Sequence, residues 1–450
     1  MIVLFSVANF RSFSTEQTLS LVASQQLSTR HQTHVIPIPD STAQVLKTSV
    51  LYGANGAGKS NLFKALEYLK RLVLTPRSKN TGTGRQVFRF ADHTSEQPSR
   101  FDLQFIAQGK CYRFGCAVTD QQIIEEWLVQ VIGEQEKTVY ERITDENGKV
   151  TIEAAQNTSH KLAALVTVGG PPNQTFLATI RATLDEADYG EEIAAVLAWF
   201  ENSLTLIAPE TSFGTLGAQL ANDSAFREFA GTFLKASATG VSAIQAQKQE
   251  ITEDALHSLL PESVVSRLLN EVTDNEPGNG IVQLDKEKAL LIERSEKNHY
   301  YRLTIQTVHQ HQQKPINLDL ADESDGTRRL LNLIPALHQL HNAVYFIDEI
   351  DRSLHPMLVW KFLEFFLKSN LNGQRQMIVS THESHLLDLD LLRRDEIWFA
   401  EKDSFGATHL YSLSEFKPRN PLDIRKYYLQ GRFSAIPLLD HLEQLLEETK

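Results

Sequence analysis

Residues 53–60 read Gly-Ala-Asn-Gly-Ala-Gly-Lys-Ser and form a complete G-x-x-x-x-G-K-[ST] motif. In such a loop the glycines let backbone N–H groups turn toward phosphate oxygens. The lysine, here Lys59, reaches the β- and γ-phosphates, and the serine hydroxyl, here Ser60, ligates Mg²⁺. A β-prone run at 48–52 precedes the loop, and 61–74 has an apolar helical face. This order points a helix N-terminus at an anion. The motif therefore predicts a nucleotide site, and a glycine-rich turn without a ligand is the alternative.

A second group of polar side chains follows two apolar runs that read as buried parallel strands. Residues 343–347 lead into Asp348 and Glu349, and residues 376–381 lead into His382. Ligands bind at the carboxyl ends of such strands. We expect Asp348 to hold Mg²⁺ through water and Glu349 to polarise the attacking water as general base. Helix capping is the alternative for the two acids. We expect His382 to reach a γ-phosphate, with a structural histidine as the alternative.

A third feature is the turn Ser324-Asp325-Gly326, which stands just before a helical pattern. A serine and a glycine at a helix start offer a hydroxyl and bare N–H groups to an anion. An ordinary N-cap turn is the alternative. The turn lies immediately before the strand at 343–347 that ends in the two acids, which we call the acidic strand. In this position the turn would not obviously contact the phosphate loop of its own chain.

Length and charge limit the classes of protein that fit. The chain has 450 residues, which suggests two or three domains, and its apolar (42%) and charged (22%) fractions are ordinary for a globular protein. A net charge of −12 argues against a broad cationic surface that coats DNA. A local basic group, for which a solvated face is the alternative, lies near the C-terminus: Lys417, Arg419, Arg425, Lys426 and Arg432.

The sequence also predicts where the protein resides. No apolar run approaches the roughly 18 residues of a membrane span. Residues 1–9 lack a basic leader and a small-residue cleavage site, so we expect no signal peptide. Cys111 and Cys116 lie five apart on a predicted strand, which puts them on opposite faces and disfavours a disulfide or a zinc pair. We therefore expect a cytoplasmic protein without a membrane partner.

Hydrophobic periodicity divides the chain into segments. Period-two patterns over 1–24 and 88–152 predict a strand pair and an antiparallel meander. Residues 25–47 read as a loop, and the basic stretch 75–85 reads as a flexible connector. Helical periodicity dominates 185–272. Further along, strand character returns at 281–308, α/β elements fill 318–413, and an amphipathic helix at 438–446 packs on its own domain or docks to a partner.

We expect four parts from these segments. They are residues 1–180, with the phosphate loop and the meander; residues 181–280, a helical insertion; residues 281–415, with the serine turn, the acidic strand and His382; and residues 416–450, a basic segment and an amphipathic helix.

The order of the motifs resembles that of the ABC-type ATPases. The motifs are Asn-Phe-Arg-Ser-Phe at 9–13, the phosphate loop, Ser-x-Gly before a helix, the acidic strand, the loop at 351–354, and Ser-Thr-His at 380–382. Specifically, the chain is similar to the branch that includes RecF, the structural-maintenance-of-chromosomes (SMC) proteins and the overcoming-lysogenization-defect (OLD) nucleases. The resemblance covers residues 1–70 and about 315–415. It implies an α/β ABC-ATPase head with an antiparallel meander lobe and a parallel phosphate-loop core, interrupted by a helical insertion.

In that family ATP lies between two subunits, with the phosphate loop of one facing the signature serine of the other. The resemblance implies that Ser324 and Gly326 act in trans, that His382 is the switch histidine and that Asp351 joins the two sites. Gln86 is the candidate for the glutamine that senses Mg²⁺. The signature Ser-Asp-Gly-Thr departs from Ser-Gly-Gly-Gln, which bears on the trans contacts and the hydrolysis rate. Nucleotide contacts in cis are implied for Arg11, Gly53, Asn55, Gly56, Gly58, Lys59, Ser60 and Asn61.

Within this branch the layout most resembles the ATPase subunits of bacterial anti-phage systems such as Septu, retron-associated and PARIS systems. OLD proteins carry a C-terminal TOPRIM nuclease, whereas residues 383–450 show no clustered acidic pattern for metal-dependent cleavage. The resemblance therefore implies ATP and Mg²⁺, a homo-oligomer of at least two copies, and a separate effector. That effector would be an HNH or TOPRIM nuclease, in some systems with a reverse transcriptase and its DNA.

Two other functions are the alternatives. A RecF-like DNA-repair ATPase would clamp DNA directly. The nucleotide-binding domain of an ABC transporter is disfavoured by the motif at residues 9–13 and by the large middle insertion.

Overall fold

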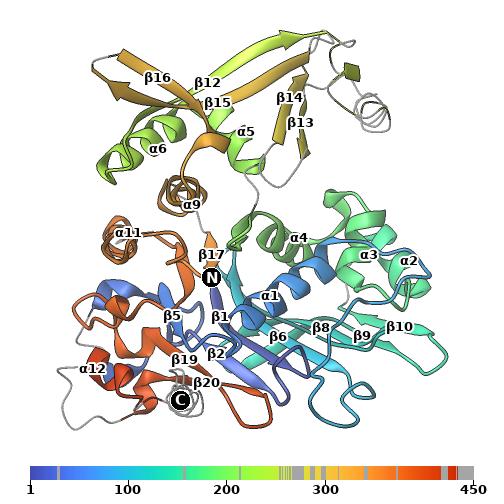
Figure 1. Ribbon diagram of the computed structural model, residues 1–450. Helices are drawn as coiled ribbons and strands as arrows, with labels where there is room; N and C mark the ends of the chain where they lie inside the picture. Colours follow the sequence, from blue (N-terminus) through green and yellow to red (C-terminus); the bar gives the residue numbers. More distant parts are fainter. Residues whose placement is uncertain are drawn as a thin grey trace, which may run out of the picture. The chain divides into compact units, whose positions relative to one another are not determined.

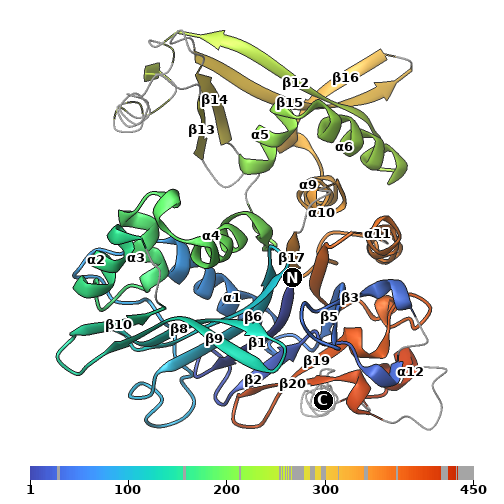
Figure 2. The same cartoon turned by 180° about the vertical axis from the view of Figure 1, so that it is seen from behind.

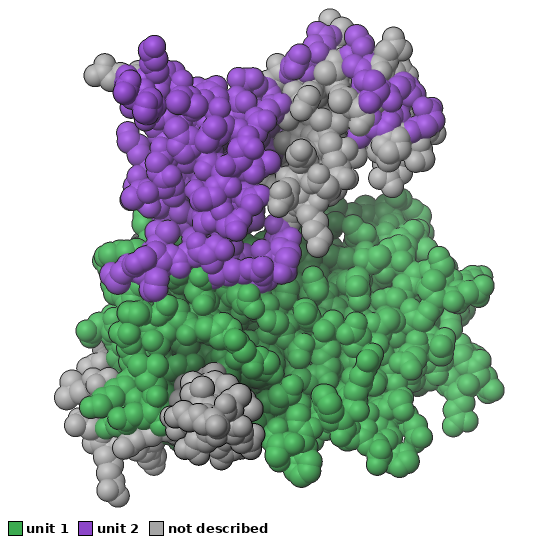
Figure 3. Space-filling view, in the orientation of Figure 1, with its two compact units in different colours: residues 1–207, 340–351, 359–450 green, residues 208–339, 352–358 purple. Residues whose placement is uncertain are grey.

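The computed structural model forms two compact units, which are coloured in Figure 3. Unit 1 comprises residues 1–207, 340–351 and 359–450, and unit 2 comprises residues 208–339 and 352–358. The structure describes residues 1–27, 31–155, 159–211, 214–252, 255, 257–258, 260, 262, 265, 278–283, 289–294, 300–312, 314–338, 343–370, 373–416, 424–431 and 433.

Unit 1 contains a six-stranded sheet in which five neighbouring strands are parallel (Figure 1). The last strand, β20, is antiparallel to β19. Strands β5 and β17 are buried along their whole length, as expected for parallel strands covered on both faces. Because β5, β17 and β18 run in the same direction, their carboxyl ends meet at one edge. In spatial order the strands are β11 (Leu204–Ile207), β17 (Val344–Ile347), β18 (Gln376–Thr381), β5 (Thr48–Tyr52), β19 (Ile397–Lys402) and β20 (Thr408–Ser412).

The second sheet of unit 1 has seven antiparallel strands, which confirms the predicted strand pair and meander. Alternate residues of β6 are buried, the pattern of a strand with one solvated face. In spatial order the strands are β10 (Val150–Ala154), β9 (Gln135–Thr144), β8 (Ile123–Ile132), β7 (Lys110–Val118), β6 (Ser99–Ala107), β1 (Ile2–Ala8) and β2 (Gln17–Ser20). Both cysteines lie on β7, buried and free.

Helix α1 (Lys59–Leu74) packs between the two sheets. On one side Phe63 meets Phe346 of β17, with ring centroids 5.4 Å apart. On the other side Tyr68 meets Phe101 of β6, also at 5.4 Å. A helix covered on two sides needs apolar residues around more than one stripe, which the run 61–74 supplies.

Smaller elements complete unit 1. Figure 2 shows α2 and α3 beside the β8–β10 end of the antiparallel sheet, where Tyr140 packs against Phe176. These elements are β3 (Val35–Pro37), β4 (Gln44–Leu46), α2 (His160–Val168), α3 (Phe176–Thr183), α4 (Glu191–Ala198), the π-helical turn η4 (Trp199–Ser203), α12 (Ile424–Leu429), and the 3₁₀ turns η1 (Gln25–Leu27), η2 (Gln32–His34), η3 (Glu186–Asp188), η6 (Ser384–Leu386), η7 (Arg394–Glu396) and η8 (Leu413–Glu415). Helix α11 (Pro356–Ser369) begins in unit 2 and continues in unit 1.

Unit 2 is built on a five-stranded antiparallel sheet with helices beside it. Strand β15 is the central member, because it pairs with β12, β14 and β16. The elements are α5 (Gly214–Asn222), α6 (Ser224–Ala236), β12 (Val241–Ile251), β13 (Gly278–Gln283), β14 (Ala289–Arg294), β15 (Tyr300–His311), β16 (Lys314–Asp319), the 3₁₀ turn η5 (Leu320–Asp322), α9 (Asp325–Leu333) and α10 (Pro335–His338).

Several expectations from the sequence are wrong in detail. Strands β11 and β12 lie within 181–280, where a helical insertion was expected. Strand β11 has only four residues, and β12 directly follows α6 and is largely polar, so neither carries a strong strand pattern and tertiary pairing decides such cases. The loop expected at 25–47 contains the strand pair β3–β4.

The stretch 75–85 is also more than a flexible connector. The side-chain amide of Asn173 donates to the carbonyls of Ser78 and Thr81, each at 2.8 Å. The guanidinium of Arg85 is buried and donates to Ser95 and Val118 carbonyls. Hydrogen bonds to residues far away in sequence therefore hold the stretch 75–85 in place. Such contacts cannot be predicted from the local sequence.

Some expectations concern residues beyond the described part of the chain. Lys417, Arg419, Arg432 and the predicted helix at 438–446 all lie outside it. Within the described part, Arg425 and Lys426 lie on α12, and the Arg425 guanidinium is 3.0 Å from Nε2 of His385. None of the helices in the described ranges combines the length and the hydropathy that a bilayer crossing requires.

A buried charged pair locks α3 to the meander. Glu126 of β8 and Arg142 of β9 are both almost fully buried, with their side chains 3.9 Å apart. The Glu126 carboxylate accepts hydrogen bonds from the Phe176 backbone N–H at 2.8 Å and from the Tyr140 hydroxyl at 2.6 Å. Arg142 donates to the Ile123 carbonyl at 2.7 Å. The carboxylate thus caps the start of α3, where N–H groups lack partners within the helix.

Glu126→Ala tests this lock. Removing one partner leaves Arg142 buried without its counter-ion, so we expect a loss of about 3–5 kcal/mol in the free energy of unfolding, measured by chemical denaturation. The matched control is Glu125→Ala. Glu125 pairs with Arg100 on the same sheet at half-exposed positions, so its loss should cost about 1 kcal/mol or less. Equal effects of the two variants would contradict the assignment.

Candidate nucleotide-binding site

The phosphate loop connects β5 to α1 and depends on its glycines. Gly56 and Gly58 have φ angles of 78° and 110°, a region that residues with a Cβ rarely adopt. A Cβ at Gly58 would lie 2.1 Å from Oγ1 of Thr408, and one at Gly53 would lie 2.5 Å from the Ala400 carbonyl oxygen. By contrast, nothing lies within 4 Å of the corresponding position at Gly56. The loop is therefore packed from behind and open at Gly56, as a phosphate cradle must be.

Two residues outside the phosphate-loop motif, Ser12 and Thr408, support the loop from behind. Thr408 Oγ1 lies 2.8 Å from both Ser12 Oγ and the Ala57 carbonyl oxygen. Asn61, predicted to contact the nucleotide, donates its side-chain amide to Ser12 Oγ at 2.8 Å. The Asn-Phe-Arg-Ser-Phe turn thereby supports the loop through Ser12. The sequence motif pointed to this turn, whereas Thr408 comes from β20 and could be found only in the fold.

Lys59 is buried and its ammonium group is turned toward its own loop. Nζ donates to the carbonyls of Gly53 at 2.7 Å and Ala54 at 3.1 Å. Burial lowers the pKa of Lys59 to about 8, against the opposing attraction of Asp348, Asp351 and Glu349. The site thus holds a desolvated cation, which gains from a ligand that brings negative charge.

His382 lies beside this lysine, directly after β18, the strand that pairs with β5. Its Nδ1 is 3.4 Å from Lys59 Nζ. Burial and the nearby Lys59 ammonium lower the pKa of His382 below its ordinary value, with Asp351 and Glu349 opposing. The lowered pKa favours the neutral imidazole, and in the tautomer with its proton on Nε2 the Nδ1 atom accepts a hydrogen bond from the lysine.

The two acids at the end of β17 are held by the neighbouring strand. Asp348 is buried and accepts a hydrogen bond from Ser380 Oγ of β18. The same hydroxyl accepts from the Glu349 backbone N–H at 2.8 Å. Glu349 has a φ of 48°, a conformation that costs energy for a residue with a side chain and is common at functional sites. Ser380 thereby fixes the backbone turn between the two acids.

Asp351 completes the acidic side of the site. Its Oδ2 lies 3.4 Å from the His382 backbone nitrogen, and its buried Oδ1 has no hydrogen-bond partner within the described structure. A buried oxygen of this kind calls for a donor or a cation. Lys59, the Ser60 hydroxyl and the Asp348 carboxylate supply a cation and hard oxygen ligands, which fit a triphosphate and Mg²⁺.

Arg11 and Gln86, predicted from the resemblance, are brought together by the backbone. The Arg11 N–H donates to the Gln86 carbonyl at 2.7 Å, and Arg11 has a φ of 53°. Burial lowers the pKa of Arg11, with Glu67 opposing and Arg71 adding to the effect. The buried Nε of Arg11 has no partner in the described structure. This donor is compatible with the predicted nucleotide contact, and Gln86 is exposed.

The serine turn lies in unit 2. Ser324 is the N-cap of α9, and its Oγ accepts from the Thr327 backbone N–H at 3.2 Å. The Ser324 side chain is exposed. A Cβ at Gly326 would lie 2.9 Å from the Ser353 carbonyl oxygen, so this position is too tight for a side chain. The N-cap geometry is present, and the role of the turn toward a neighbour's phosphate stays a prediction.

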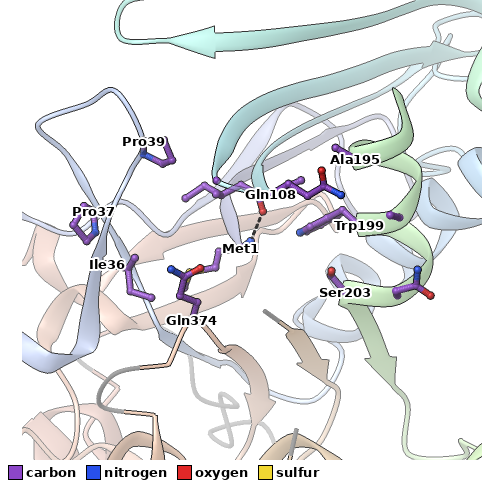
Figure 4. A pocket seen from close by; sticks show the side chains of 14 residues that line it. Met1, Ile36, Pro37, Pro39, Gln108, Ala195, Trp199, Ser203 and Gln374 are labelled. Carbon is purple, nitrogen blue, oxygen red and sulfur yellow. Dashed lines mark hydrogen bonds between the residues drawn. The ribbon is translucent and has the colours of Figure 1, made fainter. Parts of the chain in front are cut away.

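A cavity of unit 1 lies away from these residues (Figure 4). It measures about 230 Å³ and is lined in part by Ile36, Trp199 and Gln374. Gln374 precedes β18, whereas His382 follows that strand, so the cavity lies at the opposite edge of the parallel sheet from the phosphate loop.

Comparisons with known proteins give one family. The family described as "AAA domain, putative AbiEii toxin, Type IV TA system" matches residues 49–163 and 196–388, more than half of the chain. No curated protein matches the sequence significantly.

Solved structures match over most of the chain at low similarity. They include an SMC head domain from Thermotoga maritima (12% identity, 91% of this chain and 98% of that chain, TM-score 0.36) and an Smc head domain bound to the C-terminal domain of ScpA, derived from Pyrococcus furiosus (12%, 91% and 96%, 0.33). A third is the recombination mediator protein RecF-ATPrS (13%, 91% and 98%, 0.34). The α/β class with a parallel phosphate-loop core and an antiparallel lobe is confirmed by the strand order itself.

Lys59→Met tests the buried cation. Because folding lowers the pKa of Lys59 from 10.5 to about 8, the folded protein carries the full cost of the buried charge below pH 8, and this cost fades as the pH rises toward 10.5. The melting temperature of the nucleotide-free wild type should therefore rise relative to that of Lys59→Met between about pH 7 and pH 9.5. Lys64→Met, a change at a less buried lysine of the same helix, is the control. A pH-independent difference for Lys59→Met would contradict the burial of a charged Lys59.

Proposed function

Since the chain belongs to this AAA-domain family, we propose that it binds ATP with Mg²⁺ and hydrolyses it at the phosphate loop of unit 1. The observation that carries the proposal is the meeting of polar groups from the ends of three neighbouring strands around one desolvated lysine. Lys59 Nζ lies 3.4 Å from His382, and one serine hydroxyl, that of Ser380, holds both Asp348 and Glu349.

Each side chain has a role that follows from its chemistry. Lys59 binds the β- and γ-phosphates, for which it exchanges its hydrogen bonds to the Gly53 and Ala54 carbonyls. Ser60 and Asp348 would hold Mg²⁺, whose charge offsets that of the phosphates. His382 contacts the γ-phosphate from the neighbouring strand. Gly53, Asn55, Gly56 and Gly58 present the backbone N–H groups of the loop.

Glu349 is the proposed general base. It is partly exposed, whereas its neighbour Asp348 is buried. The left-handed backbone at Glu349 turns the chain immediately after the metal-binding position. A base must face the attacking water on the far side of the γ-phosphate from the leaving group, so two adjacent acids with different directions suit the two roles.

The second part of the proposal is that two copies of the chain share each site. Ser324 is exposed at the start of a nine-residue helix, a position at which a hydroxyl and free N–H groups can bind an anion. Ser324 and Gly326 of one copy would contact the nucleotide on the phosphate loop of the other. Nucleotide would then stabilise the assembly that binds it.

For the biological role we propose a regulatory subunit of an anti-phage defence complex. The family description names a toxin of a type IV toxin–antitoxin system, which supports such a role. The effector would be a separate HNH or TOPRIM nuclease, with or without a reverse transcriptase and its DNA. The alternative, a RecF-like clamp on DNA, requires hydrolysis that DNA stimulates with a steep dependence on salt, which a net charge of −12 disfavours. A nuclease gene beside this one would favour the first role.

Glu349→Gln tests the base. We expect a fall in kcat of about 100-fold or more with ATP affinity within about threefold of wild type, because the amide keeps the size of the side chain but cannot take a proton. The measurement is steady-state phosphate release together with equilibrium binding of a fluorescent ATP analogue.

The matched variant is Lys59→Ala, which should lose nucleotide binding itself. Normal turnover by Glu349→Gln would remove this residue from the role of base. Tight ATP binding by Lys59→Ala would remove the phosphate loop from the site.

Mixing two inactive variants tests the shared site. Lys59→Ala and Ser324→Arg should each be inactive alone. An equal mixture should recover about one quarter of the wild-type rate, because half of randomly formed dimers are mixed and each mixed dimer has one intact site. An inactive mixture, or full activity of Ser324→Arg alone, would show that the site is not shared in this way.

A further inference from the structure

A buried carboxylate precedes the serine turn in unit 2. Glu323 is 8% exposed, and it is the residue immediately before Ser324. Its Oε1 accepts a hydrogen bond from the hydroxyl of Thr307 and lies 2.7 Å from Nε2 of His309. Both partners belong to β15, and Thr307 is fully buried. One carboxylate therefore ties the turn to the central strand of the unit 2 sheet.

The backbone explains why this tie controls Ser324. Glu323 and Ser324 both have extended conformations, with φ and ψ of −73° and 155° for Glu323 and −61° and 152° for Ser324. Both dihedral pairs are in the polyproline II region, in which each side chain is turned by about 120° from the one before it. With Glu323 held inward, Ser324 is turned away from the sheet: the residue is exposed, and its Oγ accepts from the Thr327 backbone N–H at the start of α9.

The turn is held on its other side as well. Gly326 approaches the Ser353 carbonyl oxygen so closely that a Cβ on this glycine would lie 2.9 Å from it, which leaves no room for a side chain. Ser324 Oγ is meanwhile 2.9 Å from Oγ1 of Thr327, within the first turn of α9. Ser324 thus lies between two fixed residues, Glu323 and Gly326. Of these, Glu323 contacts the sheet of unit 2.

A carboxylate is a costly anchor. Removing it from water is unfavourable unless hydrogen bonds replace the lost hydration, and an apolar side chain would fill the same space more cheaply. What the carboxylate adds is direction, because hydrogen bonds from two β15 side chains define its position more narrowly than apolar contact does. At this point β15 pairs with β12 on one side and with β16 on the other, so the anchor is attached to a strand that is hydrogen-bonded along both edges.

We propose that Glu323, held by Thr307 and His309, is a positioning residue for Ser324 and that β15 thereby sets the activity of the shared ATP site. The inference rests on the proposed function. A shift of β15 would move Glu323 and with it the hydroxyl of Ser324. A structural change in the five-stranded sheet of unit 2 would therefore alter the contact of Ser324 with the nucleotide.

The experiment compares variants of the full chain at β15. Thr307→Val removes the hydroxyl at nearly constant volume, and Thr307→Ser restores it. His309→Gln changes the second partner, and His311→Gln, two residues along the same strand at an exposed position, is its control. Each variant is measured for ATP-dependent self-association by analytical ultracentrifugation, for kcat, for binding of ATP to the single protomer, and for melting temperature.

We expect Thr307→Val and His309→Gln to weaken ATP-dependent self-association and to lower kcat by about tenfold, the scale for a lost hydrogen bond to a charged group. Binding of ATP to the single protomer, which reports on Lys59 in unit 1 and is measured at a protein concentration too low for association, should change by less than about threefold. Thr307→Ser and His311→Gln should behave as wild type. A general loss of folding would instead lower kcat, self-association and binding of ATP to the single protomer together with the melting temperature, and the melting temperature separates the two causes.

Two results would overturn the inference. If wild type associates with ATP and Thr307→Val and His309→Gln do so equally well, Glu323 does not position the serine, while the proposed function stands. If wild type shows no ATP-dependent association, the shared site is wrong and this inference falls with it.

Discussion

The candidate site depends on one physical feature, the burial of the Lys59 ammonium group away from water. Lys59 is placed at the start of α1, where the glycine loop and the ends of the parallel strands leave little access to solvent. Its charge is balanced by carbonyls of its own loop and by the attraction of three nearby carboxylates. A desolvated cation of this kind is unfavourable for the empty protein and favourable for an anionic ligand.

The fold supplies that arrangement through its parallel sheet. The strands that end in the phosphate loop, in the acid pair and in His382 are neighbours running in one direction, so their polar ends lie at a single edge. Cross-strand hydrogen bonds then define the details. Ser380 orients the two acids of β17, and Thr408 and Ser12 brace the loop from behind. Each of these supports is a side chain from a different part of the chain, and together they reduce the freedom of the groups that meet the nucleotide.

Unit 2 shows the same design with a different sheet. Its serine turn is a short extended segment whose direction follows from one buried carboxylate. A polar anchor costs stability but defines position, and a shared site needs position because the two halves belong to separate molecules. The helix cap already satisfies the hydrogen bonds of the turn, so the contact of Glu323 with β15 serves to fix the position of the turn.

The sequence by itself determined the local chemistry. The eight-residue loop, the apolar strand with Asp348 and Glu349, the strand before His382 and the N-cap at Ser324 are local patterns in which backbone conformation and neighbouring side chains suffice. The alternation of the meander gave the antiparallel sheet for the same reason. Only the tertiary structure decided which distant residues support these groups. The supporting contacts join residues that are far apart in sequence: they involve Thr408, Ser380, Thr307 and the strands at 204–207 and 241–251. A short polar or apolar run does not by itself indicate which distant residue it will contact.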